Sequence, residues 1–135
     1  MKIICEDEKL VKGFEYFTKR FTLLEEKTVR ATKAENGKTS AELLKDGSIE
    51  VRYADRLSFF RSVFDLAVTG KTVDMAYGFK NLGIMLDCAR NGVPTVEFLK
   101  DYILSAVASG YTYLGLYVED CLEVEDEPKF GYMRG

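Results

Sequence analysis

The sequence predicts an α/β protein in two parts, a small α+β domain followed by one βαβ unit. Three observations predict this fold class. Strand-like segments alternate with stripes of apolar residues at helical spacing. The pair Asp46-Gly47 separates two short segments whose apolar residues occupy alternate positions. Two continuous apolar runs follow later, one on each side of a third helical stripe, as in strands of a parallel sheet.

The first elements are a short strand over residues 2–5 and a helix after it. Asp7 is placed to cap that helix, and Lys19 and Arg20 suit the negative potential of its C-terminal end. Its apolar face is formed by Leu10, Phe14, Phe17 and Phe21. A weaker strand is predicted over residues 27–33, before a polar break at 35–38.

The next elements are a hairpin and a second helix. Residues 41–43 and 49–53 flank Asp46-Gly47, which predicts a tight type I′ turn with positive φ at both central residues. Asp55 is expected to cap a helix that Gly70 ends. Its apolar positions are Leu57, Phe60, Val63, Phe64, Ala67 and Val68. The order β-α-β-β-β-α predicts a small, mostly antiparallel sheet with both helices on one face, over residues 1–72.

After a connection over residues 73–80, the pattern predicts two parallel strands joined by a helix with a right-handed crossover. The strands are residues 82–86 and 113–118, whose unbroken apolar character predicts burial on both faces. Pro94 suits the first helical turn and Gly110 the end of the helix. The apolar stripe is Val96, Leu99, Ile103, Ala106 and Val107.

Composition narrows the function classes. The net charge is −3 and the basic residues are dispersed among acids, so no nucleic-acid partner is expected. No apolar run approaches the roughly 18 residues of a membrane span, and the acidic start at Glu6-Asp7 does not resemble a signal peptide. A cytoplasmic protein is therefore expected.

Histidine is absent, which excludes His-based nucleophile arrangements and the usual zinc sites within this chain. Cys5, Cys88 and Cys121 are an odd number without Cys-x-x-Cys spacing. We therefore expect neither disulfides nor a thiolate metal site, and interpret all three as buried small apolar residues.

The polar residues that follow the two parallel strands form the candidate site. Asp87 and Arg90 follow the first strand, and Glu119 and Asp120 follow the second. Ligands of parallel α/β sheets bind at this end of the strands. Arg90 could donate to two neighbouring sugar hydroxyls, or pair structurally with Asp87 or Glu119; spacing alone favours neither.

Two other interpretations of these acidic residues, a glycosidase pair and a metal site, have less support. Glu119 and Asp120 are consecutive in an extended segment, so their side chains point to opposite faces and do not form a glycosidase pair. A divalent metal on Asp87, Glu119 and Asp120 would need more oxygen donors than these. No metal or cofactor is therefore expected.

Four separated segments carry a family resemblance. They are residues 82–91 (LGIMLDCARN), 93–95 (VPT), 116–120 (LYVED) and 127–135 (EPKFGYMRG). In this order they resemble the opening of the catalytic (β/α)8 barrel in a bacterial branch of glycoside hydrolase family 20, the β-N-acetylhexosaminidases. The resemblance covers residues 81–135, and those enzymes carry a small α/β domain before the barrel, as predicted here for 1–72.

The resemblance implies an exo-acting, retaining hydrolase of terminal β-linked N-acetylglucosamine or N-acetylgalactosamine. In the family the substrate's acetamido oxygen attacks the anomeric carbon, an Asp orients the acetamide, and a Glu is the general acid and base. That pair would lie beyond Gly135, so this chain alone is expected to be inactive. Arg90 matches the arginine that holds the sugar hydroxyls, and Asp120 an acid that supports the network. Asp87 and Glu119 are further substrate-binding candidates.

The resemblance also implies an N-acetylhexosamine-terminated glycan as the partner of the full-length enzyme. Self-association of this chain is expected as well, because two barrel strands and one helix leave apolar faces uncovered. Two alternatives stay open: a non-catalytic α/β module that binds carbohydrate or protein, and a different barrel hydrolase of N-acetylated sugars, similar to O-GlcNAcases.

Overall fold

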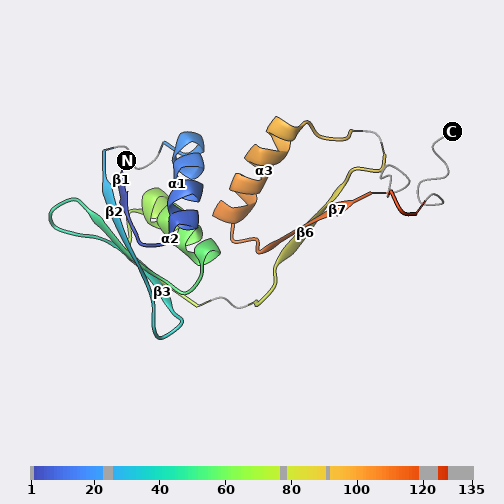
Figure 1. Cartoon of the computed structure of the whole chain (residues 1–135). Coiled ribbons are helices and arrows are strands. Elements are labelled where there is room, and N and C mark those ends of the chain that lie inside the picture. The colour runs from blue at the N-terminus through green and yellow to red at the C-terminus, as the bar shows by residue number, and fades with distance from the viewer. Residues whose placement is uncertain (1, 23–25, 77–78, 91, 119–124, 128–135) are drawn as a thin grey trace.

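A computed structural model describes residues 2–22, 26–76, 79–90, 92–118 and 125–127 of the chain. These residues form a mixed α/β fold with a five-stranded and a two-stranded sheet (Figure 1). The elements are β1 (Lys2–Ile4), α1 (Glu8–Arg20), β2 (Thr28–Lys33), β3 (Thr39–Leu43), β4 (Ile49–Tyr53), α2 (Arg56–Thr69), β5 (Val73–Met75), β6 (Gly83–Asp87), α3 (Val96–Ala108) and β7 (Tyr113–Tyr117). Within these residues, no helix combines the length and apolar character needed to span a membrane.

The five-stranded sheet has the order β1-β2-β4-β3-β5. β4 therefore lies between β2 and β3, and it pairs parallel with β2 and antiparallel with β3. β1 pairs parallel with β2, so the expectation of a mostly antiparallel sheet is wrong. Residues 73–75, expected as part of a connection, form β5 and pair antiparallel with β3.

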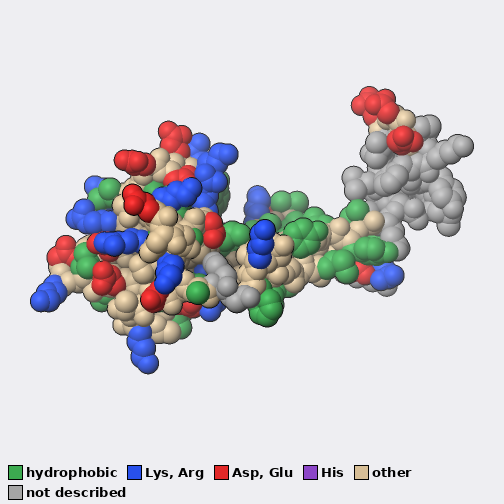
Figure 2. All heavy atoms as spheres, turned by 90° about the horizontal axis from the view of Figure 1, so that it is seen from below, with side chains coloured by type: hydrophobic (Ala, Val, Ile, Leu, Met, Phe, Trp, Pro, Cys, Tyr) green, Lys and Arg blue, Asp and Glu red, His purple; other side chains and the backbone are tan. Residues whose placement is uncertain are grey.

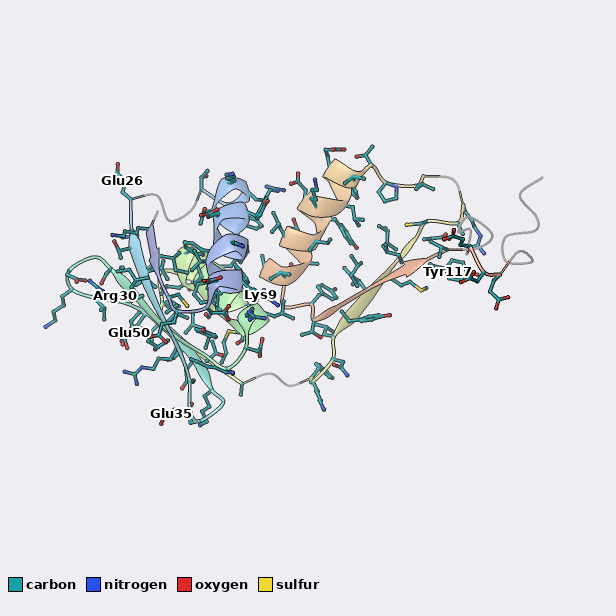
Figure 3. All side chains as sticks on the ribbon, in the orientation of Figure 1. Lys9, Glu26, Arg30, Glu35, Glu50 and Tyr117 are labelled. Atoms are coloured by element: carbon teal, nitrogen blue, oxygen red, sulfur yellow. The ribbon has the colours of Figure 1, made fainter. Side chains whose placement is uncertain are left out.

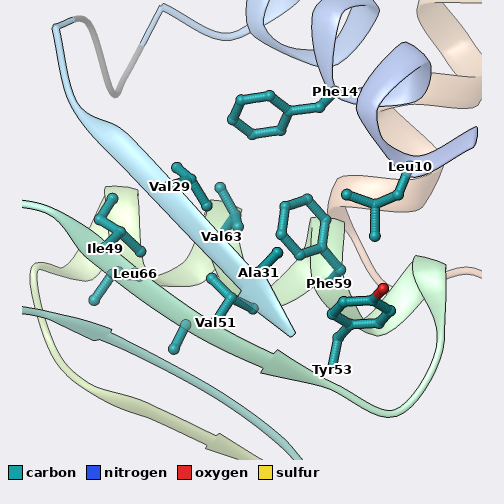
Figure 4. Close-up of a cluster of buried hydrophobic side chains, with 11 residues drawn as sticks. Leu10, Phe14, Val29, Ala31, Ile49, Val51, Tyr53, Phe59, Val63 and Leu66 are labelled. Carbon is teal, nitrogen blue, oxygen red and sulfur yellow. The ribbon is translucent and has the colours of Figure 1, made fainter. Parts of the chain in front are cut away.

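The main core lies between this sheet and the helices α1 and α2 (Figure 4). Asp7 caps α1 as predicted, because its carboxylate accepts hydrogen bonds from the backbone N–H groups of Lys9 and Leu10. Alternate residues of β2 and β4 face the helices, since side chains alternate across a strand. The buried cluster is Leu10, Phe14, Val29, Ala31, Ala41, Ile49, Val51, Tyr53, Phe59, Val63 and Leu66.

The second helix begins and ends as predicted, with Asp55 as the N-cap and Gly70 in the left-handed conformation at φ 66°. Its core-facing side agrees with the predicted one only in part: Val63 is in the core and Phe60 and Ala67 pack against it. The buried residues are Ser58, Phe59, Ser62, Val63 and Leu66, whereas Val68 is exposed. The helix is apolar around most of its circumference, so apolar spacing alone could not identify this side.

The two buried serines explain why polar residues can occupy the core side of α2. The Thr39 hydroxyl donates to Ser58 Oγ over 2.8 Å, and the backbone N–H of Ala54 donates to Thr39 Oγ1 over 2.9 Å. The Ser62 hydroxyl donates to the carbonyl of Phe59. Buried hydroxyls with such partners avoid the cost of an unsatisfied polar group.

The hairpin between β3 and β4 has a different turn from the predicted type I′. Of the described non-glycine residues only Glu26 has a positive φ, so Asp46 does not adopt the conformation that type I′ requires. Gly47 has φ 82° and donates its N–H to the carbonyl of Leu44. The Asp46 carboxylate accepts from the Ser48 N–H and hydroxyl, which fixes a three-residue turn with a glycine bulge.

The later residues form the predicted βαβ unit, in which β6 and β7 pair parallel and α3 connects them. Thr95 caps α3 and accepts from the Phe98 N–H, so Pro94 precedes the helix rather than lying in its first turn. The expected burial of both strand faces is wrong: Met85 is 71% exposed and Tyr113 is 64% exposed. The helix α3 lies on the opposite face, beside Ile84 of β6, and covers that face in part.

The helix α3 packs against α2 and α1 on its other side (Figure 1). Arg61 of α2 donates from Nη1 to the carbonyl of Ala108 over 2.6 Å, and from Nε to Asp65 Oδ2 over 2.8 Å. Ala108 is buried at this contact. Arg61 of α2 thus donates a hydrogen bond to the last turn of α3, where carbonyl groups have no partner within the helix and need donors.

Candidate functional site

The candidate site lies at the carboxyl ends of β6 and β7. The parallel register places Asp87 opposite Tyr117, and the Cys88 N–H donates to the Tyr117 carbonyl over 2.8 Å. Tyr117 lies far along the two-stranded sheet from the five-stranded sheet, where Arg30 and Glu50 lie (Figure 3). The residues that follow the two strands are therefore held together at one end of the βαβ unit.

Arg90 and Asp87 form the ion pair at this end. Arg90 Nη1 lies 2.8 Å from Asp87 Oδ2, and Asp87 Oδ1 accepts the backbone N–H of Ala89 over 2.9 Å. The Ala89 N–H and then the Arg90 side chain hold the pKa of the Asp87 carboxyl below its usual value. Asp87 is thus an anion at neutral pH, which accepts hydrogen bonds and does not act as a general acid.

Tyr117 is the third residue at this end of the strands. The guanidinium carbon of Arg90 lies 5.9 Å from the centroid of the Tyr117 ring, within the range of a cation–π contact. The Arg90 side chain is 68% exposed and that of Asp87 40% exposed. A ligand can therefore reach this cluster of Asp87, Arg90 and Tyr117, which we call the carboxyl-end cluster.

We predict that Arg90 lies near Asp87, Glu119 or Asp120 at the carboxyl end of two parallel strands, and this geometry confirms the prediction through Asp87. Glu119 and Asp120 lie outside the described residues, as does Cys121. Cys5 and Cys88 are half-buried rather than fully buried. Among the residues that the structure describes, no three His, Cys, Asp or Glu side chains gather as possible metal ligands.

Sequence reasoning missed Tyr117 as a member of this cluster. The signal that could have found it is the alternation of side chains in two parallel strands, which puts residues in register on the same side. The apolar runs alone do not show which residue of one strand pairs with which residue of the other. A shift of one residue would have placed Tyr117 on the opposite face.

The chemistry available in the cluster is binding rather than bond cleavage. An arginine with a planar fork of N–H donors, held by a carboxylate, can bind neighbouring hydroxyls or an anion. Within the described part, the cluster contains no carboxyl group with a raised pKa.

A hollow of about 400 Å³ lies between α1, α2 and α3. Phe17, Phe60 and Ile103 contribute to its mainly apolar lining, and Lys100 is the charged side chain among the lining residues that are described. The hollow lies where α3 packs against α1 and α2.

In comparisons with known proteins, no protein-family model matches this chain, and no curated protein sequence matches it.

Proposed function

We propose that the chain is the opening part of a glycosidase that resembles the β-N-acetylhexosaminidases of glycoside hydrolase family 20. In this proposal the five-stranded sheet with α1 and α2 is the small domain that precedes the barrel. The unit β6-α3-β7 contributes the first two strands and the first helix of the barrel. The observation that carries the proposal is the parallel β6–β7 pair with Arg90 and Asp87 at its carboxyl end.

The uncovered apolar surface supports the barrel part of this proposal. Ten of the fourteen large apolar residues exposed in the described chain lie between positions 79 and 118. Figure 2 shows charged side chains gathered over the five-stranded sheet and hydrophobic side chains over the narrower βαβ part. Parallel strands normally have both faces covered, so this unit lacks the cover that further barrel strands would supply.

The open face of β6 and β7 also has the polarity expected inside a barrel. Tyr113 lies at the amino end of β7, Met85 lies in the middle of β6, and Asp87 lies at the carboxyl end of β6. Barrel interiors are packed with side chains along their length, and their catalytic residues lie at the carboxyl ends of the strands. The face would therefore provide packing at one end and sugar binding at the other.

In the proposed reaction Arg90 holds hydroxyls of the terminal sugar. The lowered pKa of Asp87 suits it to keep Arg90 in place as a permanent anion. Asp120 is proposed to support the same network. The acetamido oxygen of the substrate would attack the anomeric carbon, with an Asp and a Glu from a later barrel strand orienting it and supplying the proton.

The coding sequence downstream of Gly135 tests this proposal. We expect further βα units and an adjacent Asp-Glu pair at the end of a later strand. Two carboxylates in another pattern would favour an O-GlcNAcase-like hydrolase instead. A stop codon directly after Gly135 would overturn the proposal and leave a non-catalytic binding module.

A further inference from the structure

We infer that Tyr117 is a positioning residue, whose ring holds the Arg90 guanidinium in the orientation that binds two neighbouring hydroxyls of a hexopyranose. The sugar as ligand rests on the proposed function. The contact between the ring and the guanidinium does not, because it follows from the geometry of the βαβ unit.

The backbone fixes the point on the sheet from which the Tyr117 side chain extends. Tyr117 is the last residue of β7 and stands in register with Asp87, the last residue of β6. The Cys88 N–H donates to the Tyr117 carbonyl, so the ladder of hydrogen bonds extends past both residues. The main chain at Tyr117 and Asp87 therefore cannot slide along its strand without breaking that ladder.

Asp87 and Tyr117 both contact Arg90, which comes from the segment that follows β6. Its side chain is mostly exposed, and ordering an exposed arginine costs rotamer entropy. Asp87 holds one nitrogen, Nη1, at 2.8 Å, while the Tyr117 ring lies 5.9 Å from the guanidinium carbon. The ring adds a contact on the guanidinium to the one at Nη1, and the two contacts together restrict the rotation of the guanidinium more than the carboxylate contact does.

Restricted rotation matters for a ligand with two hydroxyls. Two N–H groups of one guanidinium bind two neighbouring oxygens only when the plane of the guanidinium is correctly oriented. An arginine already held in that orientation loses less freedom on binding, which strengthens binding without a new contact. Tyr117 therefore acts through Arg90 and need not touch the sugar.

The contact can be tested in this chain by ¹⁵N NMR of the Arg90 side chain. We expect an ordered Nε–Hε group, shown by a high heteronuclear NOE, and ring-current shifts of the Arg90 side-chain protons. Tyr117→Phe keeps the ring and should preserve both signals. Tyr117→Leu should lower the NOE and abolish the shifts.

Tyr113→Leu is the matched control, because Tyr113 is an exposed tyrosine on the same strand at its other end. It should leave the Arg90 signals unchanged. Absence of ring-current shifts in the wild-type chain would overturn the inference, even if Tyr117→Leu failed to fold. An unchanged NOE in a folded Tyr117→Leu protein would also overturn it.

A longer, active form of the protein would test the sugar as ligand. Tyr117→Leu should lower kcat/KM about tenfold, mainly through KM, whereas Tyr117→Phe should stay within about twofold of wild type. Equal kcat/KM in Tyr117→Leu and wild type would overturn the positioning role. A wild-type extended form without activity would overturn the proposed function instead, and the spectra would still decide the contact.

Discussion

Tyr53 shows how burial changes the acid–base behaviour of one side chain. Its ring is buried between β4 and α2, in edge contact with Phe59 at a centroid distance of 5.9 Å. Loss of water raises the pKa of the Tyr53 phenol to about 12, and its contact with the Cys5 thiol acts in the same direction. The folded chain therefore keeps the neutral phenol at pH values where an unfolded chain would ionise it.

This difference predicts a pH dependence of stability. Below about pH 10 the phenol is protonated in both states, so it makes no difference to the pH slope. Between about pH 10 and 12 the unfolded chain releases its proton first, and the free energy of unfolding should fall as pH rises. Urea unfolding at several alkaline pH values should show a smaller fall in Tyr53→Phe. Tyr16→Phe, at an exposed tyrosine, is the control and should match wild type.

At some residues the local sequence was enough to predict the structure, and at others it was not. The caps Asp7, Asp55 and Gly70 could be predicted because each depends on local chemistry at a helix end. The turn at Asp46-Gly47 could not, because the choice between two turns depended on the Asp46 carboxylate binding Ser48. The spacing of Arg90 allowed either contacts with sugar hydroxyls or a structural ion pair, and the structure shows its ion pair with Asp87.

At the scale of elements, the ring of Tyr113 lies over β6 and β7 where glycines in both strands leave room for it. A Cβ atom on Gly83 would lie 2.9 Å from Cδ1 of Tyr113, and one on Gly115 would lie 3.3 Å from Cε1. Both glycines face the same side of the sheet as Tyr113. The Tyr113 ring can therefore lie over both strands only because the two side chains are missing.

This packing predicts that Gly83→Ala destabilises the βαβ unit by about 1–3 kcal/mol, the usual cost of overpacking. The same substitution in a Tyr113→Ala background should cost much less, because the ring that it would contact is gone. Thermal unfolding of the four proteins measures this coupling. Equal costs of Gly83→Ala in both backgrounds would contradict the packing described for Tyr113.

Other features of the elements were predictable only in part. The existence of α2 followed from its apolar residues and caps, but its core side depended on Ser58 and Ser62 finding partners in the folded structure. The continuous apolar run of β6 correctly predicted a parallel strand. It also predicted two covered faces, and the residues described here leave one face open and cover the other in part.

At the scale of the whole molecule, the two parts meet through α3, which packs on β6 and β7 on one side and on the small domain on the other (Figure 1). The mixed class and the order of most elements were predictable from local patterns. The insertion of β4 between β2 and β3 was not, because strand order depends on contacts between distant segments. Sequence patterns describe each strand but not its neighbours.

The uncovered face of the βαβ unit predicts that the 135-residue chain self-associates. Light scattering should give a mass above that of a monomer, rising with concentration. Met85→Glu places a charge on the open face and should reduce the association. Val68→Glu is the control, since it replaces an exposed apolar residue of α2 on the small domain and should have little effect. A strict monomer at every concentration would contradict the expected exposure.

The central proposal, that the carboxyl-end cluster belongs to a sugar-cleaving barrel, is tested most directly by release of a chromogenic aglycone from an aryl N-acetyl-β-glucosaminide. Three proteins are compared: the 135-residue chain, the chain extended by its downstream coding sequence, and that extended form with Arg90→Ala. We expect no release by the chain, turnover by the extended form, and a fall in kcat/KM of at least about 100-fold in Arg90→Ala. This loss corresponds to about 3 kcal/mol, because sugar hydroxyls would lose their partner in a closed pocket. An inactive extended form, turnover by the chain alone, or an unchanged kcat/KM in Arg90→Ala would contradict the account.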